Sequence, residues 1–175
     1  MSELETLKKL REKTGAGVMD CKRALAEAKG DAQAALKILE RRGHEIAAKK
    51  ATRQAKEGAV ASYVHIGGKI GVLVEINCET DFVARCDDFK ELAKDIAMQI
   101  AAADPSSVSR EEVSSNQTKD KQDGPLEIFY KTHCLLEQPF IKDEHLTIRD
   151  RLTQVIAKVG ENIVVRRFVR FQLGN

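Results

Sequence analysis

The sequence predicts an α+β protein built from a helical amino-terminal module, a linker and a mixed core. Apolar residues recur every three or four positions before residue 57, as on a helix, and every second position after it, as on a strand. Hydrophobic residues form 42% of the 175-residue chain and charged residues 32%, which is typical of a soluble globular protein. We expect a three-helix module over 1–43, a helical linker over 44–56 and, over 57–175, an α+β core with a small antiparallel sheet and flanking helices.

Glycines and an aspartate mark the limits of the three predicted helices. Gly15 favours the left-handed backbone that ends a first helix, and Gly30 and Gly43 are expected to end the second and third. Asp31 is a natural N-cap for the third helix. The apolar positions at helical spacing are Leu4, Leu7 and Leu10; Val18, Cys21, Leu25 and Ala28; and Ala35, Leu36 and Leu39.

A β-hairpin opens the predicted core. Two alternating runs, 59–66 and 69–78, flank Gly67-Gly68, a dipeptide typical of two-residue hairpin turns. This turn pairs Ile66 with Lys69, and a one-residue shift would exchange the two faces of the sheet. The face expected to be buried holds Ala59, Ala61, Tyr63, His65, Ile70, Val72, Val74 and Ile76. The opposite, partly polar face holds Val60, Val64, Lys69, Leu73 and Glu75.

A long helix and a polar loop follow the hairpin. We expect the helix from about 88 to 102, ended by Asp104-Pro105, with a buried stripe of Phe89, Leu92, Ile96 and Ile100. The serine-rich segment 104–125 is predicted to be a mobile loop. The secondary structure of 126–142 stays ambiguous.

The last helix and strand have clear limits. Thr147 and Asp150 have the spacing of a capping box, and Gly160 closes the helix that they open. The expected buried face of that helix holds Ile148, Leu152, Val155 and Val159. Residues 163–173 are predicted to form a final strand, with Ile163, Val165, Val169, Phe171 and Leu173 expected on one side, interrupted by Arg167.

Charge is divided unevenly along the chain. Residues 1–56 hold 14 Lys/Arg and 8 Asp/Glu, a net +6, whereas residues 57–175 hold 15 and 19, a net −4. The overall +2 and the aromatic content of 5% argue against nucleic-acid coats, membrane-surface proteins and stacking platforms for single strands. We therefore expect no direct nucleic-acid binding and no membrane association. The basic residues of the first module either contact an acidic surface of a partner or only solvate the short helices that carry them. Charge alone favours the second interpretation.

Cysteine usage indicates a reducing compartment. The four cysteines lie far apart without a CxxC pair, and the charged amino terminus does not resemble a signal peptide. No apolar run approaches the roughly 18 residues of a membrane span. We expect a cytoplasmic protein with free thiols.

Motifs for catalysis or cofactor binding are scarce. Gly15-Ala16-Gly17 is no dinucleotide fingerprint, because Asp20 takes the place of the third glycine. A cysteine enzyme using Cys78, His65 and Asp81 is conceivable, but Cys78 has no obvious base. We therefore expect no enzymatic site, no metal and no cofactor of its own. An acidic group that reads as solvated acids rather than a cation site comprises Glu75, Glu79, Asp81, Asp87 and Asp88.

One turn is unusual. Thr80-Asp81-Phe82-Val83 lies between a buried strand and a helix. A phenylalanine there either folds back as a hydrophobic staple onto the next helix or stands exposed as an anchor for a partner. The pattern alone favours the staple. From the residues by themselves, we predict a two-module interaction protein.

Four ordered segments resemble the bacterial elongation factor Ts family. Residues 10–25 (LREKTGAGVMDCKRAL) are similar to its amino-terminal signature and residues 75–84 (EINCETDFVA) to its second signature. Residues 135–143 (LLEQPFIKD) and 160–168 (GENIVVRRF) are similar to its carboxyl-terminal segments. The similarity spans nearly the whole chain, although 104–134 matches weakly and looks shortened.

The resemblance implies a ubiquitin-associated-like three-helix module, an α+β core and the release of GDP from elongation factor Tu. It implies that the turn Thr80-Asp81-Phe82-Val83 forms an exchange wedge, with Asp81 and Phe82 entering the partner beside its magnesium and phosphate site. The positions implied to grip a helix of the same partner domain are Arg11, Val18 and Met19. Such a protein has no cofactor of its own and acts on the magnesium and GDP bound to its partner.

The short chain also carries an implication about assembly. Longer family members have two similar subdomains in the core, so the short form implies a homodimer through the carboxyl-terminal strand region. Two other functions stay open. A ubiquitin-associated-type adaptor would bind a protein partner without exchange and would have no use for the wedge. A nucleic-acid-binding accessory factor is the other, and only the basic first module supports it.

Overall fold

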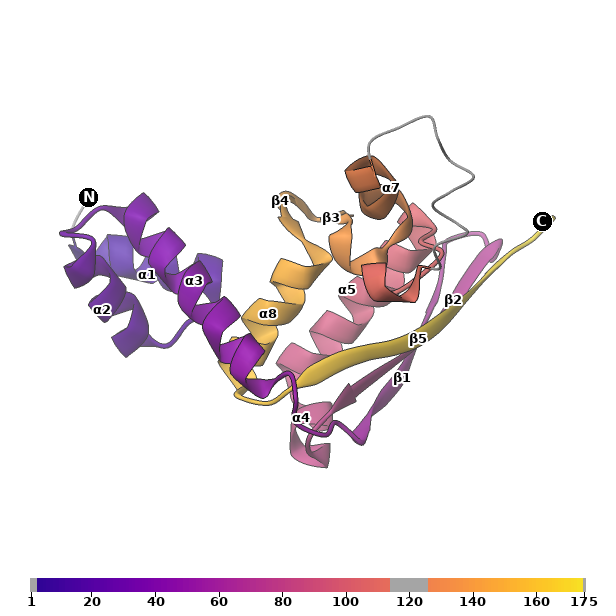
Figure 1. The fold of residues 1–175 in the computed structure, drawn as a ribbon, viewed down its shortest axis with the longest axis horizontal. Coiled ribbons are helices and arrows are strands. Elements are labelled where there is room, and N and C mark those ends of the chain that lie inside the picture. The colour runs from indigo at the N-terminus through magenta and orange to yellow at the C-terminus, as the bar shows by residue number, and fades with distance from the viewer. Residues whose placement is uncertain (1–2, 114–125, 175) are drawn as a thin grey trace. The chain divides into compact units, whose positions relative to one another are not determined.

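The computed structural model describes residues 3–113 and 126–174, which form two compact units (Figure 1). The first unit comprises Met1–Gln54 and Leu152–Asn162, and the second comprises Ala55–Arg151 and Ile163–Asn175. The predicted α+β class is confirmed, since three amino-terminal helices precede an antiparallel sheet with flanking helices. The domain limits drawn from the sequence stay a prediction.

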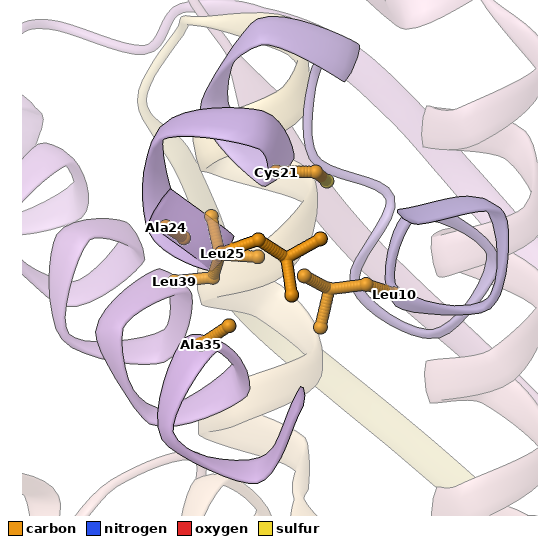
Figure 2. Close-up of a cluster of buried hydrophobic side chains, with 6 residues drawn as sticks. All are labelled: Leu10, Cys21, Ala24, Leu25, Ala35 and Leu39. Atoms are coloured by element: carbon orange, nitrogen blue, oxygen red, sulfur yellow. The ribbon is translucent and has the colours of Figure 1, made fainter. Parts of the chain in front are cut away.

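Three helices enclose a small core in the first unit. They are α1 (Glu3–Thr14), α2 (Val18–Glu27) and α3 (Ala32–Lys50). Figure 2 shows the buried side chains that meet between them, which are Leu10, Cys21, Ala24, Leu25, Ala35 and Leu39. Leu7 packs partly against this cluster, whereas Leu4, which the apolar spacing included, is exposed.

Local chemistry sets the helix limits in this unit. Gly15 has a φ of +67° and donates its N–H to the carbonyl of Arg11 at 2.8 Å, so it ends α1 as predicted. Asp31 caps α3, because its Oδ1 accepts from the backbone N–H groups of Gln33 and Ala34 at 2.8 and 3.1 Å.

The prediction that Gly43 ends the third helix is wrong, because α3 continues to Lys50. A glycine inside a helix costs about 1 kcal/mol relative to alanine but does not have to stop it. A Cβ at this position would lie 3.7 Å from Cγ2 of Thr153 and 3.9 Å from Cβ of Ala157. After α3 ends, the buried Asn162 amide donates to the carbonyl of Arg53 at 2.8 Å.

The sheet has the strand order β1-β2-β5 and is antiparallel throughout. Its strands are β1 (Glu57–Val64), β2 (Ile70–Cys78) and β5 (Ile163–Gln172). Pairing of Glu57 with Cys78 and of Val64 with Gly71 confirms the register predicted from the turn. On the predicted face of β2, Val72, Val74 and Ile76 are buried and Ile70 is half-buried. Ala59 and His65 are exposed, because β1 is an edge strand.

The prediction that the apolar residues of the last strand share one side is wrong. The register between β2 and β5 shifts at Glu75/Ile76, and a bulge of this kind moves the following side chains to the other face. Ile163 and Val165 are therefore buried, whereas Val169 and Phe171 are exposed.

One face of the sheet is covered by α5 (Asp87–Ala103), which packs against β1 and β2 (Figure 1). The predicted stripe is confirmed, since Phe89, Leu92, Ile96 and Ile100 are all fully buried. The helix ends at Asp104, whose φ is +46°, just before Pro105.

The first part of the predicted mobile loop contains a short helix and a buried side chain, and its mobility stays a prediction. Residues 104–113 include η1 (Arg110–Glu112), and Val108 is buried. The rest of the predicted mobile loop, 114–125, lies outside the described residues. The ambiguous segment forms α7 (Leu126–His133) and η2 (Leu135–Glu137), and two short strands follow, β3 (Pro139–Phe140) and β4 (Asp143–Thr147).

The final helix, α8 (Ile148–Val159), begins with the predicted capping box. The Thr147 N–H donates to Oδ2 of Asp150 at 2.9 Å, and the Asp150 N–H donates to Oγ1 of Thr147 at 3.1 Å. Gly160, with a φ of +76°, closes the helix. Of the helices in the described part of the chain, none has the length and apolar character needed to cross a membrane.

Candidate functional site

Two exposed turns carry the residues singled out from the sequence. The Phe82 turn comprises residues 80–86 and belongs to the second unit. The Met19 turn comprises residues 11–19 and belongs to the first. Each is described separately.

The Phe82 turn is fixed at both ends by buried elements. It follows Cys78, the last residue of β2, whose buried Sγ donates to the carbonyl of Thr80 at 3.1 Å. Thr80 is the N-cap of α4 (Asp81–Arg85), and its Oγ1 accepts from the N–H of Val83 at 3.4 Å. The Cys86 N–H then donates to the Val83 carbonyl at 3.0 Å, and α5 begins at the next residue.

The predicted staple is wrong, because 79% of Phe82 is exposed. Val83 and Ala84 on the same short helix are half-buried, so α4 turns these residues toward the protein and Phe82 toward solvent. The phenylalanine that is fully buried is instead Phe89, which belongs to the first turn of α5. The structure therefore realises the other interpretation of the turn, an exposed aromatic side chain.

A single cation contacts both residues at the tip of this turn. Nε of Arg85 donates to the carbonyl of Asp81 at 3.2 Å, and its Nη2 forms an ion pair with the Asp81 carboxylate. The same guanidinium lies 5.9 Å from the centroid of the Phe82 ring, which is within the range of a cation–π contact. Sequence reasoning missed this residue, although its i,i+4 spacing from Asp81 was the available signal.

The Met19 turn presents apolar side chains above a buried core. Arg11 lies exposed in the last turn of α1, and Val18 and Met19 form the first turn of α2, where they are 45% and 65% exposed. Oγ1 of Thr14 donates to the Leu10 carbonyl at 2.8 Å and accepts from the Ala16 N–H at 3.3 Å, which fixes the connecting loop. The predicted partner-binding residues of this unit thus flank one short loop.

Cys21 lies in α2 two residues after the Met19 turn, and its burial affects the chemistry of its thiol. Cys21 is fully buried, and burial raises the pKa of its thiol above the ordinary value. A neutral buried thiol acts as a small apolar side chain, so Cys21 belongs to the packing of the turn.

The structure does not assemble the conceivable cysteine enzyme. Cys78 pairs with Glu57 at one end of the hairpin, whereas His65 lies at the other end and contacts the Tyr63 hydroxyl at 3.2 Å. Asp81 pairs with Arg85 rather than with a histidine. Within residues 3–113 and 126–174, no group of three or more His, Cys, Asp or Glu side chains is arranged to hold a metal ion. All four cysteines lie in this part of the chain, and none of them forms a disulfide.

A charged network in the second unit was not predicted. Arg110 donates to Glu127 and to Glu137 at 2.8 Å each, and Arg149 donates to Glu137 at 2.6 Å. Burial alone would raise the pKa of Glu137, but hydrogen bonds from the two arginines outweigh it and lower that pKa. The partners lie 12 to 27 residues apart in the sequence, too far for a local pattern to show them.

The sheet face opposite α5 exposes apolar side chains, and we call it the open face. Leu73 lies between Ser62 and Val169 across the sheet, and Gly71 lies between Val64 and Phe171. An ion pair of 2.7 Å between Arg167 and Glu75 lies beside these rows. The exposed apolar side chains of this face are Val60, Val64, Leu73, Val169 and Phe171.

Comparisons with known proteins point to one family. A family profile described as "Elongation factor TS" matches residues 5–123, a range that includes both turns. A protein of Carboxydothermus hydrogenoformans is 54% identical over 191 residues, covering 97% of this chain and 88% of that relative. A protein of Fervidobacterium nodosum is 54% identical and covers 97% of each chain. A third, from Caldanaerobacter subterraneus subsp. tengcongensis, is 49% identical over 99% of this chain and 98% of the relative. All three are named elongation factor Ts.

Proposed function

Because this chain belongs to the elongation factor Ts family, we propose that it releases GDP from elongation factor Tu by inserting the Phe82 turn beside the partner's magnesium and phosphate site. GTP then rebinds, and the protein acts in the cytoplasm as a guanine nucleotide exchange factor for translation elongation, not as an enzyme. The observation that carries the proposal is the exposed Phe82 ring on a turn fixed at both ends.

Exchange by such a turn needs no chemistry from this chain. A nucleoside diphosphate on a GTPase is held largely by magnesium and by backbone amides around its phosphates. Burial of a phenylalanine ring in a pocket near that ion is worth about 2–3 kcal/mol, which is available to displace those ligands. Asp81 supplies an acceptor for the rearranged amides. The coupling is reciprocal, so GDP weakens the binding of this protein by the same factor.

The Met19 turn supplies the proposed docking contact. Val18 and Met19 offer an exposed apolar pair, and Arg11 adds a cation at the rim. Residues 1–56 carry 14 basic and 8 acidic side chains, and this excess accelerates encounter with an acidic surface. In this proposal the Met19 turn holds the partner and the Phe82 turn displaces its nucleotide.

The open face supports the proposed homodimer. Phe171 near the end of β5 and Leu173 just after it are 67% and 76% exposed, and β5 is also an edge strand. Exposed apolar rows beside an unpaired strand edge are typical of an association surface. We place the carboxyl-terminal strand region at a two-fold interface between copies of this chain.

Release of a fluorescent GDP analogue from elongation factor Tu tests the exchange activity. The protein should accelerate release, and Phe82→Ala should lose most of the effect while remaining folded. Leu4→Ala is the matched control, because Leu4 is also 79% exposed but lies outside both turns. Absence of acceleration by the wild-type protein would overturn the proposal, and binding without acceleration would identify an adaptor instead.

Light scattering at micromolar concentration tests the dimer separately. We expect the mass of two chains for the wild-type protein and of one chain for Phe171→Asp, since a carboxylate at the interface would have to be desolvated. A wild-type mass of one chain would contradict the dimer without affecting the exchange proposal.

A further inference from the structure

We propose that Arg85 is a positioning residue for nucleotide exchange, which holds Asp81 and Phe82 in the free protein in the arrangement that enters the partner. This inference rests on the exchange function proposed above. It assigns a role to a residue outside the Asp81-Phe82 pair itself.

The contacts of Arg85 converge on that pair. Its Nε bonds to the backbone carbonyl of Asp81 at 3.2 Å, its Nη2 pairs with the carboxylate of Asp81, and its guanidinium lies 5.9 Å from the Phe82 ring centroid. A planar guanidinium presents several N–H groups in a fixed geometry and also stacks on aromatic rings. One side chain therefore restrains the backbone of the first residue of α4, its carboxylate and the neighbouring ring together.

The Phe82 turn needs such a restraint. The helix α4 has five residues, too few for a helix to be stable by its own hydrogen bonds. Phe82 is 79% exposed, so core packing does not select its rotamer. Without Arg85, both side chains have to become ordered when the partner binds. The apparent affinity is then reduced in proportion to the fraction of free molecules that already hold the competent arrangement.

A purely structural role does not fit the surroundings of Arg85. Its side chain is 69% exposed and that of Asp81 is 50% exposed. An ion pair of this exposure contributes little to the stability of a fold. Its effect is therefore expected on the arrangement of the turn, not on global unfolding.

The test measures exchange on elongation factor Tu carrying a fluorescent GDP analogue, over a range of concentrations of the full chain. For Arg85→Gln we expect the half-saturating concentration to rise about three- to fivefold with an unchanged plateau rate. Arg85→Lys keeps the charge and should recover part of the loss. A wild-type half-saturating concentration for Arg85→Gln would overturn the proposal, and so would a lower plateau, which would place Arg85 in the exchange step.

The matched control is Arg41→Gln, which removes one charge from an equally exposed residue. Arg41 is 66% exposed, pairs with Glu27 at 3.7 Å and with Glu45 at 3.9 Å, the latter also at i,i+4, and lies in α3 outside both turns. Because Arg41 is one of the 14 basic residues of 1–56, we expect a rise in the half-saturating concentration, but one well below that for Arg85→Gln. An equal rise in the half-saturating concentration for Arg41→Gln and Arg85→Gln would show that the loss of one charge explains the effect, and it would overturn the positioning role.

A second measurement asks whether Arg85 acts through the pair. Affinity for nucleotide-free elongation factor Tu is measured for Arg85→Gln in the wild-type background and in an Asp81→Asn/Phe82→Ala background. The substitution should weaken binding only in the former, and equal losses in both would overturn the proposal. If the wild-type protein accelerates exchange and Phe82→Ala does not, a null result for Arg85→Gln defeats this inference alone.

Discussion

The Phe82 turn and the Met19 turn both expose apolar side chains beside a tight turn, but they are built differently. The Phe82 turn lies between β2 and α5, whose facing residues are fully buried, and its own hydrogen bonds and Arg85 fix it. The Met19 turn lies on a small three-helix unit whose core consists of leucine, alanine and one cysteine (Figure 2).

This difference suits two different tasks. A ring held in one arrangement loses little freedom on insertion, so most of its burial energy is available to displace a bound nucleotide. A methionine is flexible and adapts to the surface that it meets, which suits a docking contact. We therefore expect loss of the Phe82 ring itself to lower the exchange rate at saturation and substitutions in the Met19 turn to weaken binding.

The largest expected effect is on the small core under the Met19 turn. Leu25→Ala should cost about 2–5 kcal/mol of unfolding free energy, because Leu25 is buried in a cluster with few other large side chains. Amide hydrogen exchange should increase more over residues 11–19 than over residues 80–86. Equal increases in hydrogen exchange over the two turns would contradict the conclusion that the Met19 turn depends on this small core and the Phe82 turn does not.

A smaller effect is expected at the docking contact itself. Met19→Ala should weaken binding to elongation factor Tu by about 1–2 kcal/mol, roughly five- to thirtyfold, with the plateau exchange rate unchanged. Titration of fluorescent-GDP exchange measures both quantities, with Leu4→Ala as the control for an exposed apolar residue of the same unit. A lower plateau exchange rate with an unchanged half-saturating concentration would contradict this prediction, because Met19 would then act in displacing the nucleotide and not in docking.

Salt should affect the two steps unequally. Between about 50 and about 300 mM salt, screening should slow association with elongation factor Tu severalfold, because residues 1–56 carry a net charge of +6. The plateau rate should change less, since the inserting ring is uncharged. Stopped-flow association and exchange rates at each salt concentration check this, and an association rate indifferent to salt would remove the role assigned to the basic residues.

The smallest expected effect is a stabilisation in α3. Gly43→Ala should raise the unfolding free energy by about 0.5–1 kcal/mol, because the helix passes through this position and the new Cβ meets only ordinary contacts at 3.7 and 3.9 Å. Thermal unfolding measures the change. A lower midpoint would mean that Thr153 and Ala157 leave no room for the methyl group.

The features predicted correctly from the sequence depend on neighbours along the chain. Gly15 ends α1, Asp31 caps α3, and Gly67-Gly68 sets a hairpin register that pairing over eight residues preserves. Each of these depends on a backbone conformation or a hydrogen bond within a few residues.

The features missed depend on the tertiary environment. Gly43 lies beside Thr153 and Ala157, and a bulge in the pairing with β2 sends Val169 and Phe171 to the open face. For the candidate site, the sequence identified the turn but favoured the wrong orientation of Phe82, because the helical pattern predicted the burial of Phe89 without showing toward which side α4 turns the Phe82 ring. The ion pairs of Glu137 join residues too far apart in the chain to be recognised.

The most direct measurement of the division between the two turns is the concentration dependence of exchange for Phe82→Ala beside the wild-type protein. The plateau rate of fluorescent GDP release from elongation factor Tu should fall roughly 30- to 150-fold, which corresponds to about 2–3 kcal/mol of lost burial, while the half-saturating concentration changes little. A wild-type plateau reached only at higher concentration would contradict the proposed role, because Phe82 would then contribute to docking and not to displacement.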